Sequence, residues 1–364
     1  MKTVSYKEFE RRFLENAYKN AVPVNVAFEL TPLCNLNCKM CYVHLQDSSV
    51  RERLLSGEQW ISIMDEAVGQ GMISALLTGG EALTHPDFRK IYEHLTDAGI
   101  SVSLKSNGVL LDREILALLR DIPPKTVDVS VYGCDDASFH AVTGCRMFER
   151  VDRNLHAALD AGLPLRLMVT PSAYMMPWVR PILEYAGSFG VETRVNVYLG
   201  EPYSNTGRKK EDFDLTVDQV IDIQRMAEEI LPSAQAVTLD DEEEPEKRVR
   251  PEGAGDGDSL RCAAGRTRFA VSWEGEMLPC LQFPKEIISA NILEMGVRKA
   301  WGKVHEKIVA YRVPAACAAC DYLKECSYCP IKHGQAAFSN QCDPAICELE
   351  KRLIALRKQE VREP

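Results

Sequence analysis

Short apolar runs and longer amphipathic stretches alternate over the first 200 residues. Within each run the apolar side chains take every second position, as at Val127, Val129 and Val131, which is the period of a strand with one buried face. The expected strands are Val24–Leu30, Ile73–Thr78, Ser101–Lys105, Val127–Tyr132, Leu163–Thr170 and Thr193–Leu199. The clearest helical patterns between them are Glu58–Gln70, Pro86–Ala98, Asp112–Leu119 and Met147–Ala161. Alternation of this kind predicts an α/β fold with parallel strands joined by right-handed crossovers.

The number of units and their polar positions indicate which parallel sheet this is. Six strand–helix units fall short of the eight of a complete barrel, so we predict a partial (βα)6 barrel of the TIM type. Arg166, Arg194 and Asn196 alternate with the apolar positions and should line the inner side of this barrel. A polar inner side suits a ligand site. A half-exposed antiparallel sheet would alternate in the same way, but the linking helices favour parallel pairing.

Composition divides the whole chain into five segments. A length of 364 residues suits about two domains, with shorter segments around and between them. We expect a helical lead-in at 1–22, the barrel at 23–235, an acidic linker at 236–259, a small cysteine-rich domain at 260–347 and a C-terminal helix at 348–364.

Charge and hydropathy exclude several classes of partner. The 43 basic and 53 acidic residues give a net charge of −10, which disfavours non-specific binding to nucleic acid or to an anionic membrane. No apolar run is long enough for a membrane helix, so neither nucleic acid nor membrane is an expected partner. The first twenty residues are charged throughout and lack the apolar core of a signal peptide. A cytoplasmic location is therefore expected.

Cysteine is the most informative residue type. The chain has 13 cysteines, and in a reducing cytoplasm they are not expected to form disulfides. Most of them gather in two groups, near the start and near the end of the chain. The first group is Cys34, Cys38 and Cys41, and the second is Cys262, Cys280, Cys317, Cys320, Cys326, Cys329, Cys342 and Cys347. Clustered cytosolic thiols are typical of metal ligands.

The first cysteine group directly follows the first expected strand. Three thiolates spaced as CxxxCxxC on a short loop can hold three irons of a cubane [4Fe–4S] cluster. The fourth iron then remains open to another ligand. The alternatives are a zinc site completed by a distant histidine, or buried cysteines without a metal.

This segment resembles the signature of the radical S-adenosylmethionine (SAM) superfamily. Further motifs agree with the resemblance, each at the end of a successive expected strand, where parallel sheets build their sites. By this resemblance the SAM-binding residues are Gly79, Gly80 and Glu81 of a GGE motif, Ser106, Asn107, Ser130 and Arg166, with Tyr42 near the adenine. Tyr132 departs from the pattern, because relatives often carry an aspartate in its place.

The resemblance also implies a mechanism. Three cysteines hold the [4Fe–4S] cluster and SAM chelates its open iron. One electron from a low-potential donor such as flavodoxin or ferredoxin cleaves SAM to methionine and a 5′-deoxyadenosyl radical. The radical then abstracts a hydrogen atom from the substrate. The cofactor supplies this chemistry and the protein orients it. No catalytic acid or base can be assigned from the sequence.

The second cysteine group resembles the SPASM extension of peptide-modifying radical SAM enzymes. That resemblance implies two auxiliary [4Fe–4S] clusters. Cys262, Cys280 and Cys329 would hold the first, and Cys317, Cys320 and Cys326 with one late cysteine the second. The first cluster then has three cysteines and an open iron, unless Cys342 completes it and Cys347 completes the second. A zinc-knuckle domain is the alternative, since paired CxxC units suit tetrahedral zinc.

The two resemblances together imply a radical SAM oxidoreductase that acts on a peptide. The leading prediction is maturation of a ribosomally made precursor peptide through a thioether or carbon–carbon crosslink, or through oxidation. The alternatives are oxidation of a protein residue, as in anaerobic sulfatase maturases, and dehydrogenation of a small molecule or haem precursor. A non-catalytic iron–sulfur or zinc scaffold is the alternative outside enzymes.

Overall fold

The computed structural model describes residues 5–43, 45, 48–198, 213–231, 259–260, 262–326 and 328–360. Its strands are β1 (Asn25–Glu29), β2 (Ser74–Thr78), β3 (Ser101–Ser106), β4 (Thr126–Ser130), β5 (Leu165–Val169), β6 (Glu192–Val195), β7 (Arg268–Val271), β8 (Glu276–Leu278) and β9 (Ala290–Asn291). The helices of the first two thirds are α1 (Tyr6–Lys19), α2 (Gly57–Gly69), α3 (Phe88–Asp97), α4 (Arg113–Asp121), α5 (Asp136–Thr143), α6 (Phe148–Asp160), α7 (Val179–Ser188) and α8 (Val217–Ile230). The remaining helices are α9 (Ile292–Ala310), α10 (Ala315–Ala318), α11 (Leu323–Cys326), α12 (Gln335–Phe338) and α13 (Pro344–Glu360), and the 3-10 turns are η1 (Ser48–Arg53), η2 (Ala82–Thr84) and η3 (Ala173–Trp178).

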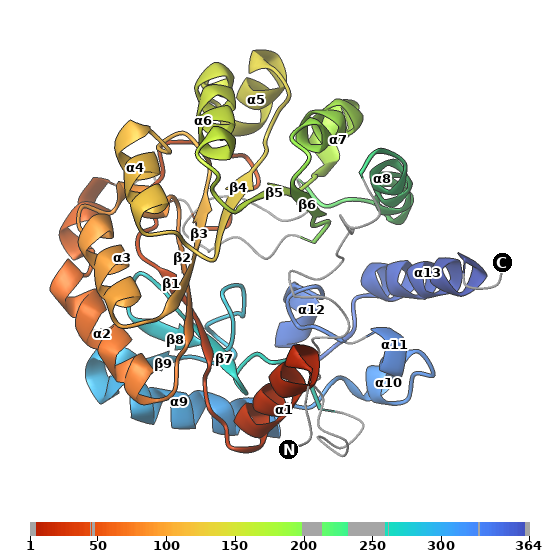
Figure 1. Cartoon of the computed structure of the whole chain (residues 1–364). Coiled ribbons are helices and arrows are strands. Elements are labelled where there is room, and N and C mark those ends of the chain that lie inside the picture. Colours follow the sequence, from red (N-terminus) through yellow and green to blue (C-terminus); the bar gives the residue numbers. More distant parts are fainter. Residues whose placement is uncertain are drawn as a thin grey trace.

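The described strands form one curved sheet in the order β6-β5-β4-β3-β2-β1-β7-β8-β9. Strands β1 to β6 pair in parallel with their sequence neighbours, and α2 to α7 lie along the outer side of the curve (Figure 1). The predicted α/β fold with a partial TIM-type barrel is therefore confirmed. The sequence patterns left α5 and α7 unassigned.

The cysteine-rich region extends this sheet. Strand β7 pairs in parallel with β1, with Asn25 opposite Arg268 and Phe28 opposite Val271. Strands β8 and β9 then continue antiparallel. The C-terminal region is thereby tied through main-chain hydrogen bonds to the strand that leads into the first cysteine loop.

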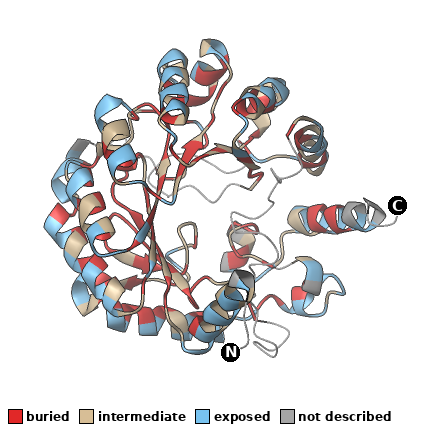
Figure 2. Ribbon diagram, in the orientation of Figure 1, coloured by how far each residue is buried: buried red, intermediate tan, exposed pale blue. Residues whose placement is uncertain are grey.

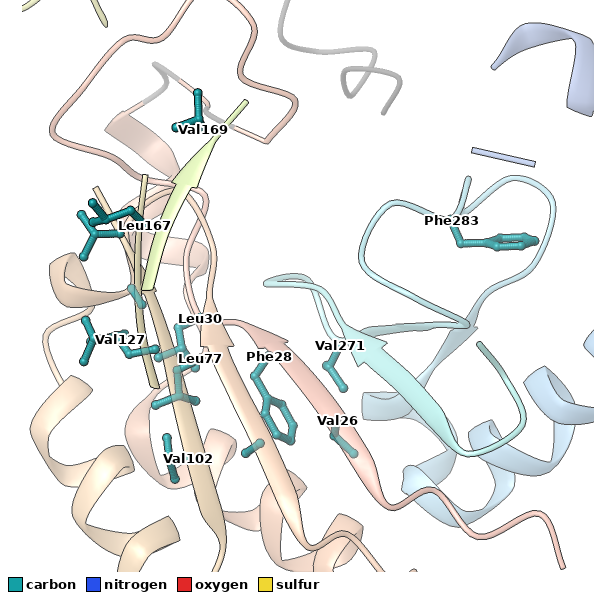
Figure 3. Close-up of a cluster of buried hydrophobic side chains, with 14 of the residues drawn as sticks. Val26, Phe28, Leu30, Leu77, Val102, Val127, Leu167, Val169, Val271 and Phe283 are labelled. Carbon is teal, nitrogen blue, oxygen red and sulfur yellow. The ribbon is translucent and has the colours of Figure 1, made fainter. Parts of the chain in front are cut away.

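The hydrophobic core lies between the sheet and its outer helices. Phe28, Leu77, Val127 and Leu167 come from four different strands and are all fully buried, and they lie in the side-chain cluster of Figure 3. The helices turn their buried faces toward the sheet and their exposed faces outward (Figure 2). Because side chains alternate along each strand, the polar residues between these core positions face the inner side, as the sequence predicted.

Local sequence explains where the helices begin. Ser56 caps α2 and Thr216 caps α8, each by a capping box with a glutamine three residues later. Helix α13 begins at Pro344, so Cys347 lies in its first turn.

The predicted acidic linker at 236–259 lies outside the described residues, apart from Ser259. No helix in the described part of the chain is long and apolar enough to cross a membrane.

Candidate active site

The loop at 31–43 joins β1 to the region before α2 and carries Cys34, Cys38 and Cys41. A neighbouring element holds its main chain, because Asn37 N donates to Thr143 O at the end of α5 over 2.9 Å. Cys38 is buried and the other two cysteines are half-buried. Three thiols on one anchored loop are the donor set that an iron–sulfur cluster requires.

The surroundings of Cys34 also suit a cluster. Leu36 N lies 3.4 Å from Cys34 Sγ and Asn107 Nδ2 lies 3.5 Å from it. Burial raises the pKa of the Cys34 thiol to about 12. A bound metal ion would offset this penalty on the thiolate, and N–H donors directed at sulfur are typical of cluster ligands. The residues present therefore fit the predicted cluster.

The GGE turn after β2 lies directly against the cysteine loop. Gly80 N donates to Thr31 O at 2.7 Å and Glu81 N to Leu33 O at 2.9 Å. A Cβ added at Gly79 would lie 2.3 Å from Thr31 O, and one at Gly80 would lie 2.4 Å from Leu33 O. Gly79 also has φ +138°, a conformation that side chains disfavour. This close approach explains why both positions are glycine.

Glu81 joins the GGE turn to the motif that follows β3. Its side chain is 1% exposed and accepts hydrogen bonds from Asn107 N (2.7 Å), Ser106 Oγ (3.1 Å) and Leu83 N (3.2 Å). Burial raises the pKa of this carboxyl group to about 7. Asn107 Nδ2 in turn donates to Asn35 Oδ1 at 2.7 Å. The structure thus brings three motifs that are distant in sequence into one hydrogen-bonded network.

Two predicted residues lie at this same edge of the sheet. Ser130 ends β4, and Tyr42 donates its hydroxyl to Glu29 Oε1 at 3.2 Å. Burial raises the pKa of Tyr132 well above its usual range, and the Cys38 sulfur acts in the same direction. Tyr132, in the position of the family's aspartate, therefore lies close to the cysteine loop.

Arg166 lies lower on the inner wall, near the amino end of β5. It forms a bidentate ion pair with Asp128, with Nε 2.9 Å from Oδ1 and Nη2 2.6 Å from Oδ2. Asp128 and Glu29 are also buried, although neither was among the predicted site residues. A carboxylate inside an otherwise apolar strand was the signal available for each of them.

The first auxiliary group lies around the β7–β8 hairpin. Cys262 precedes β7 and Cys280 follows β8, and a hydrogen bond from Gly265 N to Pro279 O (3.2 Å) joins their two segments. Gly275 lies in the turn between β7 and β8 and has φ +80°. This backbone conformation favours glycine at that position before Cys280. The third predicted ligand, Cys329, lies farther along the chain, after α11.

The second auxiliary group gathers around α10, α11 and the start of α13. Cys342 Sγ and Cys347 Sγ lie 2.8 Å apart. Burial raises the pKa of Cys317, and a hydrogen bond between Cys317 and Cys342 partly offsets this rise. Burial also raises the pKa of Cys326 to about 12. The structure therefore places both late cysteines together, with Cys317 beside them; Cys320 follows Cys317 at the end of α10.

A buried polar contact joins the barrel to this C-terminal region. Lys332 Nζ lies 2.9 Å from Glu350 Oε1, with side chains 8% and 6% exposed. The Tyr198 hydroxyl, which follows β6, donates to the same oxygen at 2.8 Å. Lys332 also lies over the Tyr198 ring, 4.2 Å from its centre. The auxiliary region is thus fixed against the end of the barrel.

Comparisons with known proteins agree with this architecture. The family model described as radical SAM superfamily matches residues 28–177, and that of an iron–sulfur cluster-binding domain, SPASM, matches residues 262–330. The AdoMet-dependent heme synthase of Methanosarcina barkeri is 28% identical over 84% of this chain and 91% of its own length. The subtilosin biosynthesis protein AlbA of Bacillus subtilis is 24% identical over 74% of this chain, which spans 58% of AlbA.

A solved structure shows the same fold. Streptococcus suis SuiB with bound S-adenosylmethionine superposes with a TM-score of 0.70 at 16% identity, over 96% of this chain and 84% of SuiB. SuiB bound to its precursor peptide SuiA gives a TM-score of 0.66 at 15% identity, over 96% of this chain and 82% of SuiB.

Proposed function

We propose that this chain, which belongs to the radical SAM superfamily and carries a SPASM iron–sulfur domain, modifies a ribosomally made precursor peptide. The observation that carries the proposal is the network in which Glu81 and Asn107 join the GGE turn and the β3 motif to the cysteine loop. The auxiliary cysteine region is packed against the same barrel. SuiB, which shares the fold, is solved with a precursor peptide, and AlbA acts in bacteriocin biosynthesis.

The residues of the chain hold and orient the reactants. Cys34, Cys38 and Cys41 would bind three irons of a [4Fe–4S] cluster. With SAM on its open iron, such a cluster supplies the one-electron cleavage that yields a 5′-deoxyadenosyl radical. Asn107 donates to the Cys34 sulfur, and Glu81 fixes the position of Asn107. The cysteine loop is thereby held in a fixed position relative to the motif residues that would bind SAM.

The remaining SAM contacts are assigned along the same edge. We propose that SAM is bound by Gly79, Gly80, Glu81, Ser106, Asn107 and Ser130, with Tyr42 beside the adenine. Arg166 belongs to the predicted set, and its ion pair with Asp128 would hold it in place below these residues.

The C-terminal region would hold two auxiliary [4Fe–4S] clusters. We assign Cys262, Cys280 and Cys329 to the first cluster, which then has an open iron. Cys317, Cys320 and Cys326 belong to the second, with its fourth ligand drawn from the adjacent pair Cys342 and Cys347. Iron content of Cys342→Ala and Cys347→Ala proteins distinguishes the two late cysteines. Electrons would come from flavodoxin or ferredoxin, and clustered thiols of this kind suit the reducing cytoplasm.

The test uses the anaerobically reconstituted enzyme, SAM, dithionite and the short peptide encoded beside its gene. The expected result is 5′-deoxyadenosine together with a peptide that has lost two hydrogens, both measured by mass spectrometry. If 5′-deoxyadenosine forms while the peptide mass is unchanged, the protein is a radical SAM enzyme with another substrate.

A haem precursor is the second candidate substrate. The match to the heme synthase extends over 91% of that protein, which is more than the chain covers of AlbA. Incubation with an iron porphyrin that carries propionate groups tests this alternative. A change in the mass of the porphyrin, with no change in the peptide, would favour it.

A further inference from the structure

A row of charged side chains crosses the inner wall of the barrel. Lys105 on β3, Asp128 on β4, Arg166 on β5 and Glu192 on β6 are successive register partners. They share one face, because residues in register on neighbouring parallel strands point to the same side of the sheet. The core residues Leu104 and Val127, which flank Lys105 and Asp128 in sequence, point to the opposite side, toward the helices.

The carboxylates of this row already have cationic partners. Both oxygens of Asp128 are bound by Arg166. Glu192 Oε1 lies 2.5 Å from Arg194 Nε and 3.9 Å from Arg166 Nη1. From β3 to β6 the inner wall thus has three cations and two carboxylates, and the surplus cation is Lys105.

Lys105 has no hydrogen-bond or ion-pair partner among the described residues. Lys105 is half-buried, and an ammonium group that loses contact with water is stabilised by an anion beside it. Glu29, the inner-wall carboxylate on the other side, stands on β1 with β2 between them and accepts a hydrogen bond from Tyr42. The chain as a whole has a net charge of −10, so an unmatched cation on this wall is a local feature.

Lys105 lies deeper in the barrel than the motif residues that follow β2 and β3, at the level of Arg166. Gly79 to Glu81 follow β2, and Asn107 follows β3, so these motif residues lie beyond the strand ends. Lys105 lies within β3, in register with Asp128 inside β4. A ligand group that reaches Lys105 would therefore lie along the wall below the motif residues.

We propose that Lys105 binds a carboxylate of the substrate. The inference rests on the proposed function and deepens it, because it identifies the peptide as one with an acidic side chain or free C-terminus close to the attacked residue. The ammonium group would form a charge-assisted hydrogen bond with that carboxylate, which is stronger than one between neutral groups.

The test compares matched probes on the anaerobically reconstituted enzyme with SAM bound. The probes are the capped tripeptide acetyl-Ala-Glu-Ala-amide, its glutamine counterpart, and free glutarate, with binding measured by calorimetry. We expect the glutamate peptide to bind about tenfold more tightly than the glutamine peptide, a difference of about 1.4 kcal/mol, because a charge-assisted hydrogen bond is stronger than one between neutral groups. Lys105→Met should reduce this ratio to about one, and Lys105→Arg should keep most of it.

The controls separate this inference from general effects. Lys125→Met removes an exposed lysine just before β4 and should leave the ratio unchanged. Equal binding of both peptides to the wild-type enzyme, or no measurable binding of glutamate peptide and glutarate, would overturn the proposal. The proposal would also be overturned if Lys105→Met weakened SAM binding but kept the affinity ratio of the glutamate and glutamine peptides. The carboxylate bound by Lys105 would then be that of SAM. If glutarate binds through Lys105 while the neighbouring gene's peptide stays unmodified, the carboxylate site stands and peptide maturation fails.

Discussion

Replacing Gly80 with alanine should damage the site through one methyl group. The added Cβ would lie 2.4 Å from Leu33 O, whereas ordinary contact begins at 3.4 Å, so the two backbones must separate by about 1 Å. That shift breaks the hydrogen bonds from Gly80 N to Thr31 O and from Glu81 N to Leu33 O, which contribute about 1 kcal/mol each. Overpacking adds about 1–3 kcal/mol. We expect Gly80→Ala to lower the free energy of unfolding by about 3–5 kcal/mol.

The assay is urea unfolding of the metal-free protein under anaerobic, reducing conditions, followed by iron analysis after reconstitution. Gly80→Ala should also lose iron from the cluster held by Cys34, Cys38 and Cys41, because the displaced backbone belongs to the loop that carries these cysteines. Gly69→Ala is the matched control, since nothing lies within 4 Å of its added Cβ at the end of α2. It should be neutral or stabilise by about 0.5–1 kcal/mol. Wild-type stability and full iron loading of Gly80→Ala would refute the reasoning.

Three further perturbations test other parts of the structure. Glu350→Gln leaves Lys332 buried without its charge partner and should lower the free energy of unfolding by about 3 kcal/mol. The control is Glu325→Gln in the exposed pair with Lys358, which should change the free energy of unfolding by less than about 0.5 kcal/mol. Equal effects of the two substitutions in urea titrations would count against a buried pair. Asp128→Asn should also lower the free energy of unfolding by about 3 kcal/mol, because it leaves Arg166 with only a distant carboxylate. A thermal melt that matches the wild type would contradict the bidentate geometry. Because the pKa of Glu81 is raised from 4.5 to about 7 in the fold, the folded state holds the extra proton between these values, so stability should fall by about 3 kcal/mol as pH rises from 4.5 to 7. Glu81→Gln should remove that part of the pH dependence, and an unchanged pH profile would show that the carboxyl group is not desolvated.

The sequence predicted the strands and the motif edge because both are local patterns. Period-two alternation marks β1 to β6, and Gly79, Gly80 and Glu81 lie where a strand of that period ends. The terminal helix was predicted to begin at Glu348, whereas it begins at Pro344.

Apart from α5, what the sequence did not predict depends on contacts between distant segments. Helix α5 has a weakly segregated pattern of polar and apolar residues, and it is fixed by the side chain of Asp135 at its start. The pairing of β7 with β1 joins four-residue segments more than 200 positions apart. The ion pair of Asp128 with Arg166 depends on the register of β4 and β5, and residue types alone do not give that register.

We propose that the eleven clustered cysteines of this chain supply the ten ligands of three cluster sites, one for SAM and two auxiliary. The most direct measurement is iron, sulfide and zinc per chain after anaerobic reconstitution. We predict about twelve irons with matching sulfide and no zinc, at four irons per cubane cluster. About four irons together with zinc would contradict the claim, because the C-terminal cysteines would then form a structural zinc domain.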